Sequence, residues 1–249
     1  MPSRMRLTVC DGKPRERVCG VHMLEFDSRA LTNRDRFVQQ FFSVGQIQYG
    51  VAVAGNRDSV AAYRQQFTID VMPRPSRVPE PRQHTVIIRR DGSIMAAQPA
   101  ELEIVQGDVV SWHTPVSVAT GCVIRGTGPD GPFDSSALTR AAIYLHTFYC
   151  PGEYCWADAN QQTVSGVVIV QQVNHHNPAA CQAWKKSLRT GVRIRVRGND
   201  VDPTSLCIAA GQAVLWVIEQ ASGISVTDAR LFAHTGQKRI AQSSPKPGR

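Results

Sequence analysis

The chain repeats itself, and this repeat limits the folds that it can adopt. Residues 26–52 (FDSRALTNRDRFVQQFFSVGQIQYGVA) align without a gap on residues 133–159 (FDSSALTRAAIYLHTFYCPGEYCWADA). Identical residues occupy the pairs Phe26/Phe133, Asp27/Asp134, Ser28/Ser135, Ala30/Ala137, Leu31/Leu138, Thr32/Thr139, Phe41/Phe148, Gly45/Gly152 and Ala52/Ala159. Aromatic residues occupy Phe37/Tyr144, Phe42/Tyr149 and Tyr49/Trp156. Chance seldom keeps so many matches in one register, so the chain contains more than one copy of a structural unit.

A different part of the unit recurs further along the chain. Residues 99–112 (PAELEIVQGDVVSW) align without a gap on residues 203–216 (PTSLCIAAGQAVLW). The shared Pro, Leu, Ile, Gly, Val and Trp place Trp112 opposite Trp216 in this alignment. Together the two alignments predict one complete unit flanked by two partial ones.

The predicted division has six segments along the chain. They are a partial unit with the later strands (1–71), a Pro-rich linker (72–83), the complete unit (84–173), a second linker (174–190), a partial unit with the early strands (191–235) and a basic flexible tail (236–249). Four prolines in the first linker predict an extended, semi-rigid connection.

The local pattern indicates β-structure throughout the chain. Leu102, Ile104 and Val109 alternate or nearly alternate with polar neighbours, and residues 167–170 form an apolar β-branched run suited to a buried strand. Hydrophobic residues make up 42% of the chain and charged residues 19%, a composition typical of a folded core. The predicted class is therefore an all-β sandwich of short strands.

Three motifs in residues 84–173 resemble those of the cupredoxins, the plastocyanin-like blue-copper fold. They are EIVQGDVVSW, which looks like the early strand pair, LHTFYCPGEYCW, which looks like the HTF-x-x-PG-x-Y segment, and SGVVIVQ, which looks like the closing strand. The resemblance implies a Greek-key β-sandwich of cupredoxin type. It implies that Trp112, Phe148 and Trp156 face the core. The hydroxyl of Tyr154 is expected to tie the crossover to nearby backbone, as in a tyrosine corner.

The copper ligands of the resembled family are missing from this chain. By alignment Gly121 stands at the first His position, Asp158 at the Cys position, Gln161 near the second His and Val164 near the Met. A blue-copper site needs two imidazoles and a thiolate with a weak axial ligand, and none of these four residues supplies one. We therefore expect no type 1 copper and no other cofactor.

Four other residues of the same unit are weak candidates for a rebuilt metal site. They are His113, His146, Cys150 and Cys155. Cys150 and Cys155 flank the Pro-Gly turn and could form a disulfide if the turn brings their Cα atoms within about 7 Å. Two buried thiols are the favoured alternative, because Cys is among the most frequently buried residues.

The formal net charge of +8 admits an anionic partner, but the Lys and Arg residues are scattered and no aromatic-studded basic stripe accompanies them. Nucleic acid is therefore not the expected partner, and a protein or another macromolecule is. No apolar run reaches the roughly 18 residues of a membrane-spanning helix. No secretory signal is visible at the start, and the protein would be extracellular if the chain were part of a secreted one.

A cupredoxin-like chain without copper ligands predicts a non-catalytic binding or structural module within a larger multidomain protein, and not an enzyme. Two alternatives stay open at this point. One is a copper-binding electron-transfer protein with displaced ligands, and the other is a slice of a multicopper oxidase-like enzyme.

The two partial units would expose open strand edges if they stood alone. One explanation, which we favour, is that the chain is a fragment of a longer protein. The other is strand complementation, in which residues 191–235 supply early strands and residues 1–71 supply late strands to a second sandwich.

Overall fold

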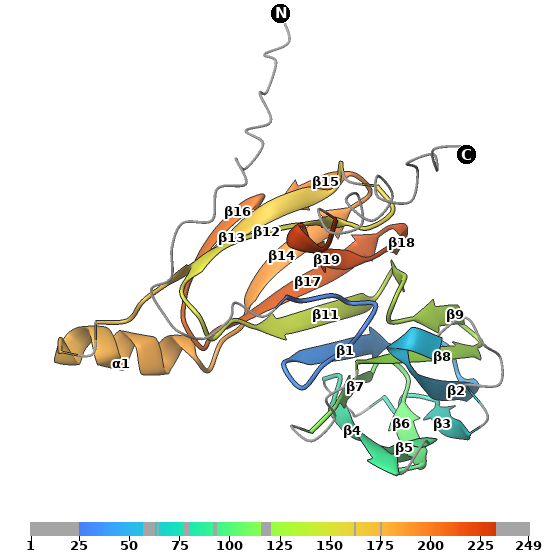
Figure 1. Cartoon of the computed structure of the whole chain (residues 1–249). Coiled ribbons are helices and arrows are strands. Elements are labelled where there is room, and N and C mark those ends of the chain that lie inside the picture. Colours follow the sequence, from blue (N-terminus) through green and yellow to red (C-terminus); the bar gives the residue numbers. More distant parts are fainter. Residues whose placement is uncertain are drawn as a thin grey trace, which may run out of the picture.

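The computed structural model describes residues 25–56, 63, 65–76, 80–91, 94–115, 121–161, 163–174 and 176–232. The described residues are mostly β-structure, with the α-helix α1 and the short 3-10 helix η1 among the strands (Figure 1). The strands are β1 (Asp35–Gln40), β2 (Gly45–Val53), β3 (Gln66–Met72), β4 (Gln83–Asp91), β5 (Ile94–Gln98), β6 (Glu101–Val105), β7 (Val109–His113), β8 (Cys122–Gly128), β9 (Gly131–Asp134), β10 (Leu138–Thr139), β11 (Ala142–Thr147), β12 (Gly152–Asp158), β13 (Ser165–Gln171), β14 (Val192–Arg197), β15 (Asp200–Asp202), β16 (Ser205–Ala209), β17 (Ala213–Gln220), β18 (Ser222–Ile224) and β19 (Val226–Asp228). The helices are η1 (Ala54–Asn56) and α1 (Pro178–Ser187).

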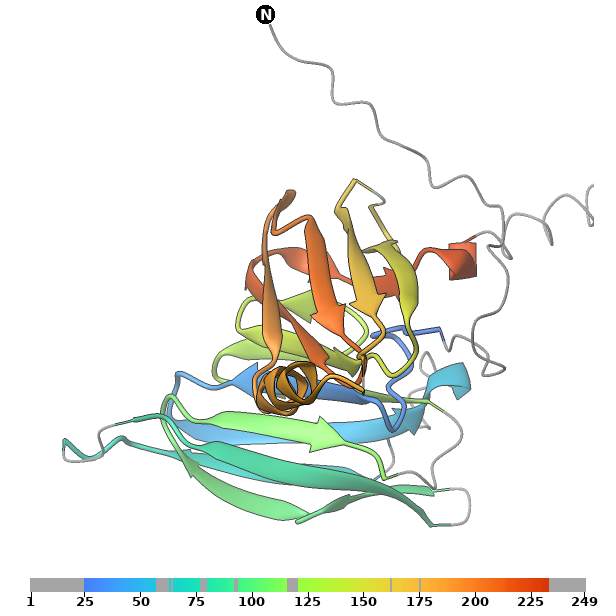
Figure 2. The same cartoon turned by 90° about the vertical axis from the view of Figure 1, so that its left-hand side faces the viewer.

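One long sheet runs through the described molecule and is faced by two smaller sheets, and β10 and β18 form a separate two-stranded sheet. The eight strands of the long sheet have the order β15-β14-β17-β11-β1-β7-β4-β5. A five-stranded sheet, β6-β3-β2-β8-β9, faces one half of it, and a four-stranded sheet, β16-β13-β12-β19, faces the other. The result is two face-to-face β-sandwiches that share the long sheet (Figure 2). We call β1–β9 the first sandwich and β10–β19 the second.

Alternating side chains build the two cores, as expected for strands with one buried face. In β14, Ile194 and Val196 are buried while the alternating Arg193, Arg195 and Arg197 are exposed. Trp112 fills the centre of the first sandwich, where Tyr49 of the facing sheet meets it edge-on. Trp216 fills the second in the same way against Trp156. The predicted all-β class is confirmed, and so is the burial of Trp112, Phe148 and Trp156.

The strand pairing corrects the predicted division of the chain. Residues 84–173 do not form one complete sandwich, because β4–β9 belong to the first sandwich and β10–β13 to the second. The late strands β1–β3 combine with the early strands that follow them, through the pairs β3–β6, β1–β7 and β2–β8. The predicted division took its frame from the strand order of the resembled family. The two alignments instead describe a single repeat whose copies begin at Phe26 and Phe133.

Strand complementation between the two ends of the chain is likewise not what the structure has. β14, β16, β17 and β19 pair with strands of the middle segment, which are β11, β13 and β12. The described contact between the two end segments is a smaller one. Asp27 forms an isolated bridge with Thr227, and Phe26 stacks on Trp216.

The registers of the long sheet follow the sequence repeat. Phe37 lies opposite Tyr144 in the antiparallel β1–β11 ladder, and these two residues are partners in the alignment. On the outer sides of that pair, Phe37 lies opposite Trp112 and Tyr144 lies opposite Trp216. A two-fold axis through the Phe37–Tyr144 pair would relate one half of the sheet to the other. Such a register is what two copies of one unit would give.

The aromatic residue that begins each copy packs into the core built mainly by the other copy. Phe133 stacks on Trp112 with ring centroids 5.8 Å apart, and Phe26 stacks on Trp216 at 5.7 Å. The backbone does the same, because Ser135 N donates to Ile124 O while Ser28 N donates to Val226 O. Each sandwich is therefore completed by a segment from the other copy.

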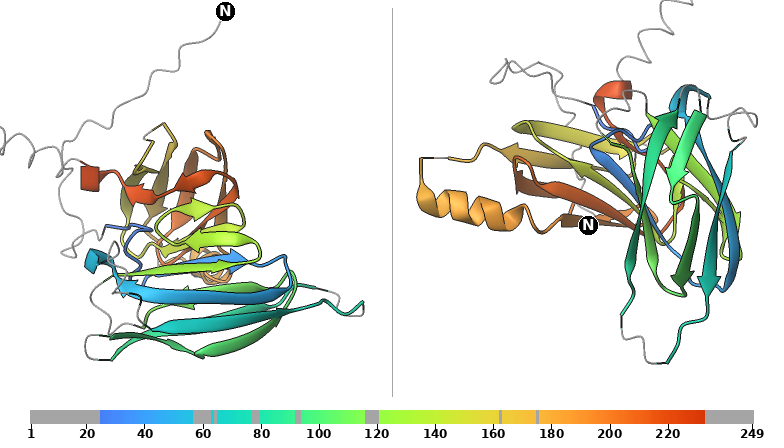
Figure 3. Two further views of the ribbon diagram at one scale, coloured as in Figure 1. Left: turned by 90° about the vertical axis from the view of Figure 1, so that its right-hand side faces the viewer. Right: turned by 90° about the horizontal axis from the view of Figure 1, so that it is seen from below.

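The second linker contains a helix where no regular structure was predicted. The N-cap of α1 is Asn177, whose side chain accepts hydrogen bonds from the N–H groups of Ala179 and Ala180. None of its residues is buried, and it projects from the body of the molecule (Figure 3). Trp184 anchors it by donating from Nε1 to Ala210 O at 2.7 Å.

We expect Phe133→Ala to lower the free energy of unfolding by about 3–5 kcal/mol, because it empties a site in the first core that the second copy fills. Urea denaturation measures this loss. Phe42→Ala is the matched control, because the Phe42 ring is 45% exposed, and it should cost less than about 1 kcal/mol. Equal losses in the two variants would contradict the exchange of aromatic residues.

Candidate functional site

The first of the four predicted copper-ligand positions has no room for a side chain. A Cβ built on Gly121 would lie 2.8 Å from the backbone of Ala30. Its carbonyl accepts a hydrogen bond from Ala54 N at 2.8 Å. The first-histidine position is therefore a close approach between two segments of backbone.

The other three positions, Asp158, Gln161 and Val164, lie in or beside the β12–β13 loop, which hydrogen bonds hold in place. The buried Asp158 carboxylate accepts hydrogen bonds from the N–H groups of Ser225, Asn160 and Gln161. Val164 is buried, and its carbonyl accepts from Asp158 N, while Gln161 is exposed. Asp158 thus ties the β12–β13 loop to the start of β19, and its oxygens are engaged by backbone N–H groups. This use of Asp158 fits a structural role better than metal binding.

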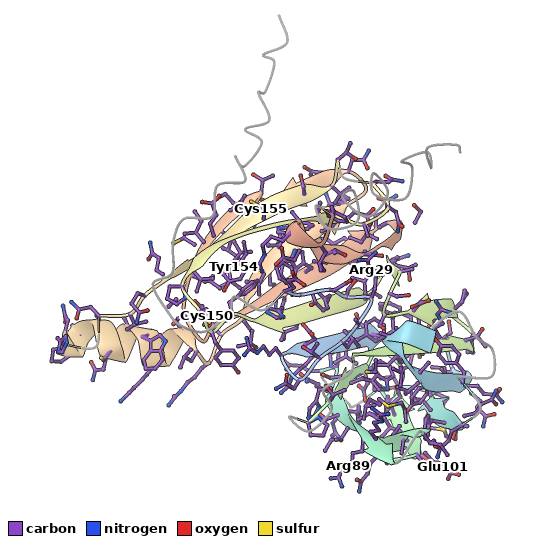
Figure 4. All side chains as sticks on the ribbon, viewed as in Figure 1. Arg29, Arg89, Glu101, Cys150, Tyr154 and Cys155 are labelled. Atoms are coloured by element: carbon purple, nitrogen blue, oxygen red, sulfur yellow. The ribbon has the colours of Figure 1, made fainter. Side chains whose placement is uncertain are left out.

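The four alternative ligand candidates do not converge. His113 lies on the side of the long sheet that faces away from both smaller sheets, opposite Arg36, whereas His146 is buried on the other side. Burial lowers the pKa of His113, and the positive charge of Arg36 lowers it further. Cys150 lies at the base of β12 and Cys155 farther along it, facing away from the core (Figure 4). Within the described residues no group of three or more His, Cys, Asp or Glu is placed to hold a metal ion.

The turn that Cys150 and Cys155 flank is held by Tyr154 and not by a disulfide. Among the described residues these two cysteines are not joined to each other. The Tyr154 hydroxyl donates to Cys150 O at 2.8 Å, so the predicted role of Tyr154 is confirmed. Burial raises the pKa of Tyr154 to about 12, which keeps this hydroxyl protonated as a donor.

A buried polar cluster joins the two copies at the middle of the long sheet. Asp35 Oδ1 accepts from the hydroxyl of Tyr144 at 2.6 Å and lies 2.7 Å from Nδ1 of His146. Asp35 Oδ2 accepts from the backbone N–H and the hydroxyl of Thr32. Burial, and then the charge of Asp35, raise the pKa of Tyr144 well above its ordinary value.

An Asp–His pair of this kind can orient a general base, but here the geometry favours a structural role. Asp35 is 1% exposed and His146 is 2% exposed. The His146 ring packs against Phe26 at 5.1 Å and Phe148 at 4.6 Å. A substrate could not reach this imidazole without opening the junction between the sandwiches.

A second buried carboxylate, Asp108, fixes the β6–β7 turn of the first sandwich. Its oxygens lie 2.9 Å from Arg74 Nη2 and 2.8 Å from His84 Nε2, and they accept from the N–H groups of Arg82 and Val105. Burial alone would raise the pKa of Asp108, but these donors outweigh it and leave the pKa below its ordinary value.

The side of the long sheet turned away from both smaller sheets, here called the outer face, carries an unusual set of side chains. Its central apolar stripe consists of Val38, Ile143, Leu145, Leu215 and Val217, which are partly exposed and lie in adjacent registers of β1, β11 and β17. A partly exposed aliphatic stripe in the middle of a large sheet is typical of an interaction surface.

Arginines border the stripe on both sides. Arg193 and Arg195 of β14 lie directly opposite Leu215 and Val217. Arg36 of β1 lies between Leu145 and His113 on the other side. All three arginines are exposed, and Glu219 approaches Arg195 at 3.8 Å. The outer face therefore combines an apolar centre with a predominantly basic border.

Sequence reasoning missed the outer face, although its signal is present. β14 reads VRIRVR, and the alternation shows that its arginines share one side of the strand. The neighbours of β14 could not be named from the sequence, because its parallel partner β17 is recognisable only once the sheet order is known.

Comparison of the chain with protein-family models, with curated proteins and with solved structures finds no match. Within the described residues, no helix has the length and apolar character needed to cross a membrane.

We expect Asp35→Asn to lower the free energy of unfolding by about 1–3 kcal/mol, because Thr32, Tyr144 and His146 lose a charged acceptor in a buried site. Asp200→Asn, at an exposed position of β15, is the control and should change stability by less than about 0.5 kcal/mol. Combining Asp35→Asn with His146→Gln should cost less than the sum of the single changes when chemical denaturation is measured. Strict additivity would show that the two side chains are not coupled.

Asp108 should contribute to the acid sensitivity of the fold. Its folded-state pKa lies below the unfolded value of about 3.9, so its stabilisation is complete above that pH and is lost as the pH falls toward the folded pKa. Thermal unfolding followed from pH 6 downward should show a shallower acid decline for Asp108→Asn than for the unmodified chain. Parallel declines below about pH 4 would argue against this assignment.

Proposed function

We propose that the chain is a non-catalytic binding module made of two copies of a cupredoxin-like unit without type 1 copper, and that its outer face binds an acidic segment of a partner protein. The observation that carries the proposal is the aliphatic stripe of the outer face with arginines along its borders.

The cupredoxin-like part of the proposal rests on the motifs and on the way they are used. The inward Trp112 and Trp216 hold matching registers, and the Tyr154 hydroxyl ties down its crossover. Matching glycines take matching backbone conformations, since Gly107 and Gly211 both have positive φ, at 89° and 90°. Two Greek-key units of one type account for these coincidences.

The non-catalytic part rests on what the polar side chains already do. Asp35, Asp108 and Asp158 are each buried and hold backbone N–H groups or neighbouring side chains. A group fixed in this way stabilises the fold, and its oxygens are already engaged by other donors. The aliphatic stripe has no such structural use among the described residues.

The choice of an acidic protein segment follows from the chemistry of the outer face. Exposed arginines and the net charge of +8 attract negative charge and speed association with it. Single-stranded nucleic acid would need aromatic stacking platforms, and the described strand residues of the outer face include none besides the imidazole of His113. An amphipathic helix, with leucines on the stripe and carboxylates toward the arginines, satisfies both halves of the surface.

A fluorescein-labelled 20-residue peptide of Leu and Glu at helical spacing is the probe for this proposal. Fluorescence anisotropy should show saturable binding that weakens with salt, and a Glu-only peptide of equal length should bind at least about tenfold more weakly because it leaves the stripe uncovered. Ile143→Glu should lower affinity for the Leu/Glu peptide by at least about tenfold, because it places a carboxylate on the stripe.

Ile169→Glu is the matched control, since Ile169 is 38% exposed on β13, away from the outer face, and its affinity should equal that of the unmodified chain. Arg193→Glu reverses a border charge without touching the stripe and should also weaken binding. Unchanged affinity in both the Ile143 and Arg193 variants would refute the proposal. Binding to phosphatidylserine-containing vesicles in place of the peptide would replace the protein partner by a membrane surface.

A further inference from the structure

The β1–β11 ladder has an inward-facing residue pair on each side of the central Phe37–Tyr144 pair. We call these two places the crossings between the sandwiches. They occupy matching positions in the repeat but contain different side chains. At one of them Asp35 faces His146 across the β1–β11 ladder, and we call this the filled crossing. At the other, Ala142 faces Gln39, and we call this the open crossing. In the sequence repeat Ala142 is the partner of Asp35, and Gln39 is the partner of His146. Any difference between the crossings therefore reflects side chains in matched positions.

At the filled crossing, polar and aromatic groups use the available space. Asp35 binds Thr32, Tyr144 and His146. The guanidinium of Arg34 lies over the Tyr149 ring, 5.1 Å from its centroid, and Tyr149 is still 56% exposed. The side chains of Arg34 and Asp35 therefore occupy this end of the junction.

At the open crossing the matched side chains are smaller. Ala141 stands where the filled crossing has Arg34, and Ala142 stands where it has Asp35. Phe42, the partner of Tyr149, is exposed to a similar degree, at 45%. A groove of about 530 Å³ lies here, between the end of β1 and the turns β8–β9 and β10–β11. Loss of side-chain volume on one side of the pseudo-symmetric junction accounts for the groove.

The groove has aromatic walls and a polar group inside it. Phe41 and Phe133 are buried walls with ring centroids 5.6 Å apart, and Phe42 adds an accessible ring. Gln39 also lines the groove and is 6% exposed. Its Nε2 donates to Gln40 O, but its Oε1 has no hydrogen-bond partner among the described residues. A buried acceptor left without a donor is costly, so a ligand that supplies one is favoured.

Two charged residues mark the rim of the groove. Asp130 Oδ2 accepts from the N–H groups of Phe42 and Ser43, which fixes the carboxylate beside the aromatic walls. Arg140 is exposed on the opposite side of the groove. The interior is therefore apolar with one acceptor, and the charges stay at the entrance.

We propose that the open crossing is a small-molecule site for a planar aromatic compound that donates one N–H to Oε1 of Gln39. The aromatic walls favour a flat ring through stacked or edge contacts, and the groove is of the size that small ligands occupy. This site is separate from the outer face and goes beyond the proposed function. A test of this site is independent of whether the outer face binds an acidic partner.

Indole and indene form a matched pair of probes, because their bicyclic shapes are nearly the same and only indole has an N–H donor. Titration of each into the isotope-labelled full chain, followed by amide NMR, should shift the resonances of Phe42, Arg140 and Ala141. We expect indole to bind about three- to tenfold more tightly than indene, which is the effect of one neutral hydrogen bond to a buried acceptor.

Gln39→Met keeps most of the side-chain volume and removes the acceptor. It should lower the affinity for indole to that for indene and leave indene binding unchanged, so that the ratio of the two affinities falls to about one. Gln46→Met, at an exposed position of β2, is the control and should keep the ratio of the unmodified chain. The proposal is overturned if neither probe binds saturably, if the shifts lie elsewhere, or if Gln39→Met leaves the ratio unchanged.

Discussion

β1 and β11 are adjacent antiparallel strands at the centre of the eight-stranded sheet, and the rest of the molecule depends on their ladder. Without it each sandwich would end in an open strand edge at the side where the two copies now meet. The ladder also determines the two crossings, because one residue pair on each side of Phe37 and Tyr144 faces the interior junction. The outer face is a further consequence, since joining the two half-sheets is what makes the aliphatic stripe continuous.

The sequence predicted the secondary structure and several core residues better than the pairing of the strands. The alternation of apolar residues gave the all-β class, and Trp112, Phe148 and Trp156 are buried where the motifs placed them. The role of Tyr154 was also predictable, because a tyrosine just after a Pro-Gly turn has backbone carbonyls within reach. The division into units was wrong because an alignment gives the period of a repeat but not the point where each copy begins. Strand pairing alone sets that point.

The candidate site could not be predicted from the sequence, because its residues become neighbours only through strand pairing. The partner of Asp35 is His146, which lies in the other copy, and nothing local in either segment indicates the contact. The outer face needs the order of eight strands before its residues can be seen as neighbours. α1 is different, because Asn177 followed by Pro178 is a recognisable helix start that the polar composition of the linker concealed. The lack of ligand side chains at the four copper-ligand positions is visible in the sequence. The structure adds that Asp158, at one of these positions, accepts backbone hydrogen bonds that hold the β12–β13 loop.

The exchange of Phe26 and Phe133 between the sandwiches has a consequence for how the chain reaches its fold. As the chain emerges from a ribosome, the first sandwich can close as soon as Phe133 follows β8, because the two are neighbours in sequence. Phe26 must wait for Trp216, which is made much later. Contacts between such distant parts of a chain form slowly, because the loop must close before the contact is gained. The segment around Phe26 is therefore the last part of the described chain to pack. The first copy completes its native contacts only after the second copy has been synthesised.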